Sequence, residues 1–166
     1  MDQNKLNTFR MPIDLVYDFK EPVQQCISNY ADKKLDIQIE IESDVVINAP
    51  KVEFRQSVIH LVDNACKFAP EGGTVIIRLS SNGNGGCDLS IYNSGSSISP
   101  VLREKVFDRF YQISHGDARQ FRGLGVGLTI ARTTARSLGG DVQFLDSDGG
   151  CHVRMQIAPA QTDWNR

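Results

Sequence analysis

The chain has 166 residues, of which 40% are hydrophobic and 23% charged, and a formal net charge of −2. This size and composition are typical of one globular domain, and the near-neutral charge argues against a nucleic-acid surface, which would carry a basic stripe. The absence of an 18-residue apolar run and the polar start MDQNKLNTFR argue against a membrane span and a signal peptide, so we expect a cytoplasmic domain. The four scattered cysteines are expected to be reduced thiols rather than metal ligands.

The first third of the chain predicts a helix followed by strands. The helix is expected to begin at Pro12. Pro22 lies inside the helical pattern, where a proline would kink or restart the helix. Residues 35–41 alternate apolar and polar side chains, which indicates a half-buried strand. Asp44 is then expected to turn the chain into a short strand at residues 45–47.

The middle third centres on an amphipathic helix predicted at residues 50–68. One face carries apolar residues at helical spacing, namely Phe54, Val58, Leu61, Val62, Ala65 and Ala69. The other face gathers polar side chains, namely Gln56, His60, Asn64 and Lys67. PEGG ends this helix, and strands are predicted at residues 74–79 and 87–92 around the turn SSNGNGG.

The last third predicts a short helix at residues 99–106, a polar loop at 113–121 and a helix at 124–138. Strands at 141–146 and 151–158 follow, on either side of a DSDGG turn. Hairpins separated by helices predict an α/β (α+β) fold. We expect a two-layer α/β sandwich whose mixed, mostly antiparallel sheet is covered on one face by helices.

The stretch RGLGVGLTIA, with Gly123, Gly125 and Gly127, raises the first functional question. Its spacing fits neither the P-loop nor the dinucleotide-binding fingerprint. Glycines let backbone N–H groups approach an anion, and a helix N-terminus favours negative charge there. Glycine also serves plain flexible turns, so spacing alone leaves a phosphate-binding loop and a flexible loop as equal alternatives.

The polar face of the 50–68 helix is, in the simplest interpretation, a solvated surface. Two residues suggest more: Asn64 is a mediocre helix former in mid-helix, and Lys67 lies one turn beyond it on the same face. An amide oxygen is a hard ligand suited to Mg²⁺, and a lysine suits a phosphate.

Four motifs in order make the chain resemble a known family. HLVDNACKFAPEGG (60–73) resembles the N-box of the ATP-binding domain of sensor histidine kinases, in the superfamily that also holds gyrase, heat-shock chaperone and mismatch-repair ATPases. IYNSGSSIS (91–99) is similar to the first glycine box, VFDRFYQ (106–112) to the phenylalanine box and RGLGVGLTIA (122–131) to the second glycine box. The resemblance covers nearly the whole chain and implies a Bergerat-type ATP-binding fold.

The resemblance also implies a domain organisation and two cofactors, ATP and Mg²⁺. Residues 1–166 would be one ATP-binding catalytic domain, with residues 1–11 the end of a linker from a missing dimerisation domain and residues 112–121 the ATP lid. Asn64 would ligate Mg²⁺, and Lys67 would contact phosphate.

Further nucleotide contacts are implied at the matching positions. Phe68 would pack near the nucleotide, Asn93, Gly95 and Ile98 would contact adenine, and Arg109 is as readily a solvated side chain as a phosphate contact. His60 and Lys67 are the candidates for a catalytic role. The second glycine box would surround the phosphates with Arg122, Gly123, Leu124, Gly125, Val126, Gly127 and Leu128.

Two positions depart from the family pattern. His60 stands where the N-box usually opens with asparagine, and imidazole prefers softer metals than Mg²⁺, so a second-shell or phosphate contact is expected there. Asn93 stands where the first glycine box usually has the aspartate that accepts the adenine amino group. An amide keeps the acceptor but loses the charge, so we expect nucleotide binding weaker by ~1–2 kcal/mol.

The implied activity is that of a histidine kinase in two-component signal transduction. The γ-phosphate of ATP would go to a histidine on a separate dimerisation domain, with a response regulator receiver domain as an indirect partner. In the family, the acceptor histidine is followed directly by Glu or Asp. None of His60, His115 and His152 is followed by either residue, so the acceptor is expected outside this chain. Neither nucleic acid nor direct membrane contact is expected, and a membrane anchor would belong to the parent protein.

Two alternatives stay open. A degenerate nucleotide-binding or protein-interaction module is favoured by the departures at His60 and Asn93. A serine kinase of the anti-sigma-factor type shares the fold, but the clear VFDRFYQ motif points away from it.

Overall fold

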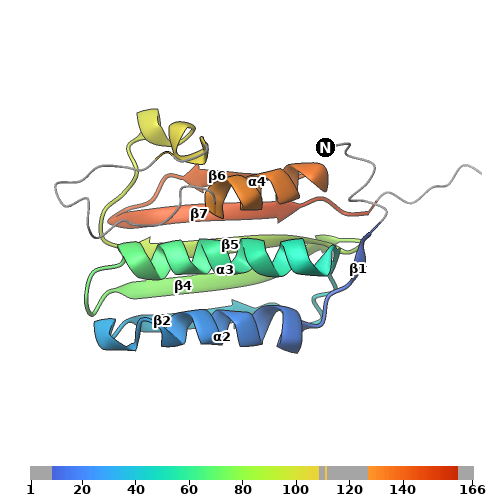
Figure 1. Ribbon diagram of the computed structural model, residues 1–166, viewed down its shortest axis with the longest axis horizontal. Helices are drawn as coiled ribbons and strands as arrows, with labels where there is room; N and C mark the ends of the chain where they lie inside the picture. The colour runs from blue at the N-terminus through green and yellow to red at the C-terminus, as the bar shows by residue number, and fades with distance from the viewer. Residues whose placement is uncertain (1–8, 109–110, 112–126, 161–166) are drawn as a thin grey trace, which may run out of the picture.

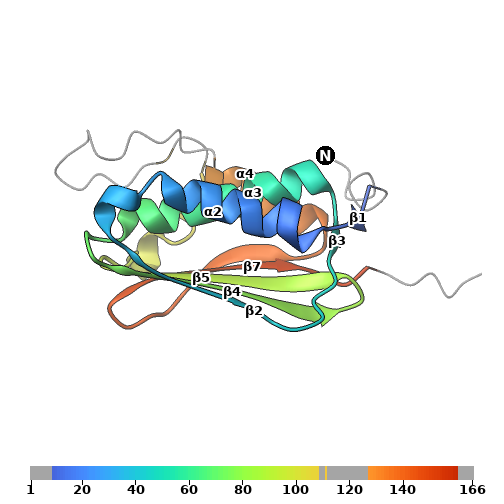
Figure 2. The same cartoon turned by 90° about the horizontal axis from the view of Figure 1, so that it is seen from below.

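The structure is a computed structural model, and it describes residues 9–108, 111 and 127–160. These residues form two layers, a five-stranded sheet and a set of helices that covers one of its faces (Figures 1 and 2). The strand order is β2-β4-β5-β7-β6, in which β2 runs parallel to β4 and the other neighbours are antiparallel. The predicted two-layer sandwich with a mixed, mostly antiparallel sheet is therefore confirmed.

The strands of this sheet are β2 (Asp36–Ile41), β4 (Thr74–Gly83), β5 (Gly86–Ser94), β6 (Asp141–Leu145) and β7 (Gly150–Ile157). Each one lies where a strand was predicted. The hairpin of β4 and β5 extends further than predicted, because the ladder continues through the polar SSNGNGG stretch to the pair Gly83 and Gly86.

The helical layer contains η1 (Leu15–Lys20, a π-helical turn), α2 (Glu21–Ser28), α3 (Lys51–Phe68) and α4 (Gly127–Ser137). The apolar face predicted for α3 is buried throughout, since none of its six side chains is more than 3% exposed. Single 3₁₀ turns are η2 (Ala31–Lys33), η3 (Pro100–Leu102) and η4 (Lys105–Phe107). The last two replace the one short helix predicted at 99–106.

The predicted start of the first helix at Pro12 was wrong, whereas the predicted restart of the helix at Pro22 is confirmed. Pro12 belongs to β1 (Met11–Pro12), and the helix begins only after Asp14, whose Oδ1 accepts hydrogen bonds from Val16 N (2.9 Å) and Tyr17 N (3.2 Å). An aspartate that accepts such bonds is a preferred N-cap, and it overrides the start suggested by the proline. Pro22 lies in the first turn of α2, where the missing N–H costs nothing, so the helix restarts there.

The short strand predicted at residues 45–47 was also wrong. Val45 and Ile47 are buried, at 7% and 1% exposure, but the strand is β3 (Asn48–Ala49), which pairs with β1. Burial of alternate side chains produced the strand-like pattern, while the hydrogen-bonding partner comes from a distant segment that no local pattern could indicate.

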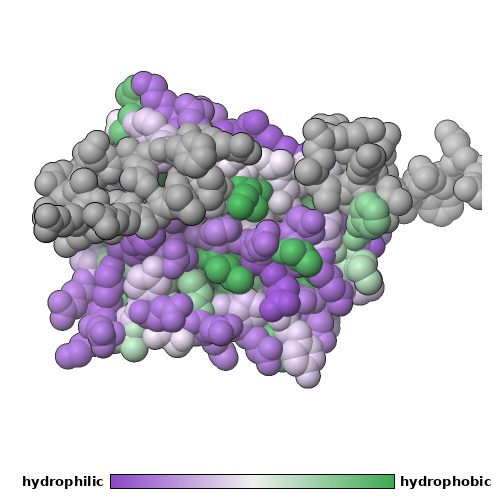
Figure 3. All heavy atoms as spheres, in the orientation of Figure 1, coloured by the Kyte–Doolittle hydropathy of each residue, from purple (hydrophilic) through white to green (hydrophobic). Residues whose placement is uncertain are grey.

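The outer side of the helical layer is mostly polar. Figure 3 shows this face as largely hydrophilic, with separate hydrophobic spots. Exposed apolar side chains on α3 include Val52 and Ile59, at 63% and 36% exposure. Apolar residues scattered in this way are ordinary on protein surfaces. Within the described ranges, no helix is both long and apolar enough to cross a membrane.

Candidate nucleotide-binding site

Three residues predicted to face the nucleotide lie along one side of α3. His60, Asn64 and Lys67 are spaced i, i+4 and i+7, so their side chains project in similar directions over two helical turns. All three are half-buried, whereas Phe68 at the end of the helix is 42% exposed. The helix therefore offers an imidazole, an amide and an ammonium on a single partly open face.

His60 lies against the first residue of α4. A methyl group at Gly127 would come within 2.9 Å of His60 Nδ1 and 3.0 Å of its Cγ, so the imidazole occupies the space that a side chain there would need. Burial lowers the pKa of His60, and the nearby Asp63 carboxylate only partly opposes this, so the ring is neutral at pH 7. A neutral ring suits the positive end of a helix. The structure thus brings the N-box and the second glycine box together through these two residues.

Lys67 is paired along the helix with Asp63. Lys67 Nζ lies 3.7 Å from Asp63 Oδ2, and Asp63 Oδ1 accepts a 2.5 Å hydrogen bond from the Tyr30 hydroxyl. Burial and the neighbouring Asp63 raise the pKa of Tyr30, so the phenol stays protonated as a donor. Tyr30 therefore fixes Asp63, and Asp63 holds the lysine near Asn64.

The end of α3 is held by a lysine from the segment before β2. Lys33 Nζ donates to the carbonyl oxygens of Cys66, Lys67 and Ala69 at 3.0, 2.7 and 2.8 Å. The last carbonyls of a helix have no partner within it, and a cation is favoured at this end. Sequence reasoning missed Lys33, Tyr30 and Asp63, because two of them are distant in sequence from the N-box and none differs from an ordinary surface residue.

The end of β5 lies beside the chain that leaves α3. Asn93 is 4% exposed, and its Nδ2 donates to Ser94 O at 3.1 Å. Gly95 follows with a φ of +110°, and a methyl group there would lie 3.0 Å from Pro70 Cδ and 3.4 Å from Phe68 O. Glycine is thus required at this position both by its backbone angle and by the close approach of the chain that leaves α3.

The remaining predicted residues divide into two groups. Ile98 and Leu128 are half-buried and pack against the hydrophobic core, so each presents only part of its side chain to a ligand. The other predicted contacts lie outside the described residues, namely Arg109, Arg122, Gly123, Leu124, Gly125 and Val126. The predicted lid at 112–121 lies outside them as well.

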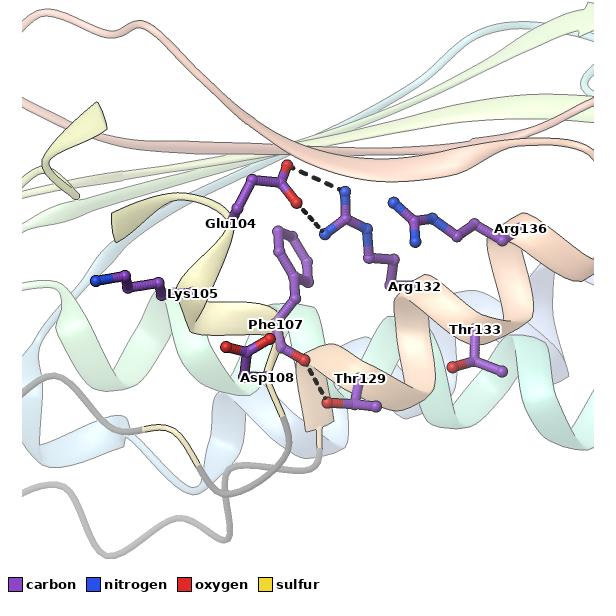
Figure 4. Close-up of a pocket in the computed structure, with 8 residues that line it drawn as sticks. All are labelled: Glu104, Lys105, Phe107, Asp108, Thr129, Arg132, Thr133 and Arg136. Carbon is purple, nitrogen blue, oxygen red and sulfur yellow. Dashed lines mark hydrogen bonds and ion pairs between the residues drawn. The ribbon is translucent and has the colours of Figure 1, made fainter. Parts of the chain in front are cut away.

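A cavity of about 380 Å³ lies elsewhere, between α4 and the chain around η4 (Figure 4). It is lined in part by Arg132, whose guanidinium lies 4.1 Å from the centre of the Phe107 ring and donates to both Glu104 oxygens at 2.8 and 3.2 Å. Arg132 Nε also donates to Asp141 Oδ1 at 3.0 Å. The arginine is thus neutralised within the protein, and the cavity carries no free cation at Arg132 for a phosphate.

The cavity and the candidate site lie on different faces of α4. Thr129, Arg132 and Arg136 line the cavity, whereas the helix buries Ala131 and Ala135. Gly127, where an added methyl group would meet His60, lies on the far side of the helix from Arg136 by helical spacing. The candidate nucleotide site is therefore separate from the cavity.

The residues at the candidate site fit ATP with Mg²⁺. Asn64 provides a hard oxygen, Lys67 a cation and Asn93 a buried amide at the end of a strand, and Gly127 brings the first described turn of α4 beside His60. Among the described residues, no group of three or more His, Cys, Asp or Glu side chains could hold a metal ion. A Mg²⁺ ion would therefore take phosphate and water oxygens beside Asn64, as this cation usually does.

Comparison with known proteins decides the family. A sequence model of the histidine kinase-, DNA gyrase B-, and HSP90-like ATPases matches residues 49–161. The chain belongs to this family. The resemblance drawn from the four motifs is thereby confirmed.

Individual relatives are sensor kinases. The chain is 31% identical over 136 residues to the signal transduction histidine-protein kinase/phosphatase MprB of Mycobacterium ulcerans, covering 80% of this chain and 26% of MprB. It is 33% identical over 132 residues to the sensor histidine kinase WalK of Bacillus subtilis, covering 79% of this chain and 20% of WalK. The chain therefore spans less than a third of the length of these two relatives.

Solved structures share the fold. The catalytic domain of histidine kinase ThkA superposes with a TM-score of 0.76 at 23% identity, covering 89% of this chain and 96% of that one. ThkA in complex with the response regulator protein TrrA gives a TM-score of 0.74 at 21% identity, covering 92% of this chain and 42% of that one.

Proposed function

We propose that this chain is the ATP- and Mg²⁺-binding catalytic domain of a sensor histidine kinase. In the reaction, a ring nitrogen of an acceptor histidine attacks the γ-phosphorus of ATP. A nitrogen–phosphorus bond forms, the bond from the γ-phosphorus to the bridging oxygen breaks, and ADP leaves. Such a transfer depends chiefly on positioning and on neutralisation of charge.

The observation that carries this proposal is the meeting of α3 and α4 at His60 and Gly127. Two motifs that are far apart in the sequence come together there, with Asn64 and Lys67 on the same face of α3 as His60. Asn64 would coordinate Mg²⁺ through its amide oxygen, and the ion supplies positive charge to the phosphates when bound. Lys67 would contact phosphate, and the α4 N-terminus would add backbone N–H groups.

The partners follow from the same proposal. The acceptor histidine would lie on a dimerisation domain joined through residues 1–11, and a response regulator receiver domain would take the phosphoryl group afterwards. Residues 112–121 would form the lid over ATP, and the domain would work in the cytoplasm. The related structure of ThkA in complex with TrrA supports the choice of a response regulator as partner.

The test is a titration of the purified chain with a fluorescent ATP analogue, with and without Mg²⁺. Asn64→Ala should abolish the Mg²⁺-dependent part of the binding. Gln56→Ala is the matched control, because Gln56 is exposed one turn before His60 on the same polar side of α3. Absence of saturable binding up to millimolar ATP in the parent chain would refute the proposal and favour the protein-interaction module.

A further inference from the structure

The sheet face that the helices leave open carries two arginines on its inner strands (Figure 2). Arg78 of β4 and Arg154 of β7 lie in register with Ser90 of β5, one on each side of it. Successive residues of a strand point to opposite faces of the sheet. The three side chains therefore point away from the helices, because their neighbours along the strands are buried in the core, namely Ile77, Leu79, Leu89, Ile91, Val153 and Met155.

The short side chain of Ser90 leaves room between the two arginines. Residues directly opposite each other on antiparallel strands have Cβ atoms about 4.5–5.5 Å apart, so those of Arg78 and Arg154 lie roughly 10 Å apart across the serine. Two arginine side chains at this spacing can reach one anion from opposite sides. The planar guanidinium group matches the geometry of phosphate oxygens and can donate two parallel hydrogen bonds to them.

Most donors of these two guanidinium groups have no hydrogen-bond partner among the described residues. Each group has five N–H donors. Arg78 uses Nε, which donates to Glu40 Oε2 at 2.7 Å, in an ion pair whose two side chains are both more than half exposed. Arg154 Nε lies 3.9 Å from Asp88 Oδ1, which is too far for a hydrogen bond. Exposed ion pairs contribute little energy, so these carboxylates leave both arginines able to bind an anion.

His152 lies on the same face, two residues before Arg154. Its Nε2 is 2.5 Å from Ser90 Oγ. Burial lowers the pKa of His152, and the positive charges of Arg78 and Arg154 lower it further. An anion held between the arginines would offset their charge and raise this pKa. By strand register, the other charged or titratable side chains on this face near the ring include Glu40, Asp88 and Tyr92.

We propose that Arg78, Arg154 and Ser90 form a binding site for a phosphate-class oxyanion on the open face of the sheet. Each guanidinium would donate to the oxygens on its own side of the anion, and the serine hydroxyl would donate from the sheet. The anion would be inorganic phosphate or the phosphoryl group of a phosphate ester. This site lies on the other side of the sheet from α3 and α4, so it does not depend on the proposed nucleotide site (Figure 2).

The experiment is an NMR titration of the histidine ring signals with inorganic phosphate, at an ionic strength kept constant with chloride. The chain has three histidines, and His152→Gln would identify the signal of His152. Phosphate should shift this signal saturably and raise the pKa of His152 above its value in chloride. Arg154→Gln and, separately, Arg78→Gln should weaken phosphate binding roughly tenfold or more, because each removes charged hydrogen-bond donors.

Two control variants locate the anion. Arg55→Gln removes an exposed arginine from α3, in the other layer, and should leave phosphate binding unchanged. Lys67→Met changes the proposed nucleotide site and should also leave the phosphate titration of His152 unchanged. If Lys67→Met abolished the shift, the anion would occupy the nucleotide site and this inference would be wrong, whereas the proposed function would stand. Thermal melts would verify that each variant is folded.

The remaining outcomes test the chemistry of the site. A shift that chloride alone produces equally, or that never saturates, would reflect general screening of charge and would overturn the inference. Phosphate affinity unchanged in both Arg154→Gln and Arg78→Gln would overturn it as well. Repeating the titration with glycerol phosphate distinguishes the two sources of the anion: an equal shift would show that the site accepts phosphate esters, and no shift would restrict it to the free anion.

Discussion

Replacing Lys33 by methionine removes an ammonium group that donates to three carbonyl oxygens at the end of α3. Methionine keeps an unbranched chain of similar length, so the loss is chiefly electrostatic. A hydrogen bond from a charged group contributes about 1.5–3 kcal/mol, and a cation at a helix C-terminus up to about 2 kcal/mol. Because Lys33 is only half-buried, water would replace part of the interaction. We therefore expect Lys33→Met to lower the free energy of unfolding by about 2 kcal/mol.

The measurement is urea unfolding followed by circular dichroism, together with thermal melts. A loss of this size should lower the melting temperature by roughly 4–8 °C in a chain of this length. Lys34→Met is the matched control, since Lys34 is the adjacent lysine and is exposed, with a φ of 52° that is equally unfavourable for either side chain. If the two variants unfold within about 0.5 kcal/mol of each other, Lys33 does not stabilise the end of α3 as argued.

Three further predictions concern the site and its surroundings. Lys67→Met should weaken ATP binding at least tenfold in a titration while barely changing the melting temperature, because its ion pair is partly exposed; unchanged affinity would exclude a phosphate contact. Gly127→Ala should lower the melting temperature through contact with His60, and the double variant with His60→Ala should recover most of the loss; simple addition of the two losses would argue against the contact. The hydrogen bonds from Arg132 lower the pKa of Glu104 below its usual 4.5, so the stability this carboxylate contributes should be complete above about pH 5 and lost as the pH falls through its folded-state pKa. Urea midpoints measured from pH 7 to pH 3 should fall less steeply in Glu104→Gln, and an identical slope would contradict this assignment.

The sequence predicted the elements whose periodicity is strict. The apolar face of α3 repeats at helical spacing over its full length, and every residue predicted on it is buried. The strand at residues 35–41 is likewise found as β2, although Ile39 is 39% exposed because β2 is an edge strand that pairs only with β4. Failures came where structure depends on distant partners: β1 and β3 are two residues each and exist only because they pair with each other.

The candidate site divides in the same way. Asn64, Lys67 and Asn93 were identified through motifs that lie within continuous stretches of sequence. Lys33 and Tyr30 were not, since each contacts α3 across 33 or more positions of the chain. In the sequence, a lysine in the run ADKK looks like an ordinary solvated side chain. Only the fold brings Lys33 to the three carbonyl oxygens at the end of α3.

The two departures from the family pattern differ in their consequences because they face different neighbours. His60 lies beside the start of α4, and burial lowers its pKa, so the ring adds little positive charge near the proposed phosphate position at pH 7. Asn93 is buried on the sheet, where the carboxylate usual in the family would bring a full negative charge into a site with little access to water. The exchange at position 60 should therefore alter how α3 packs against α4, and the exchange at position 93 should alter how strongly the nucleotide is bound. If Asn93→Asp changed the dependence of binding on Mg²⁺, this separation of the two roles would fail.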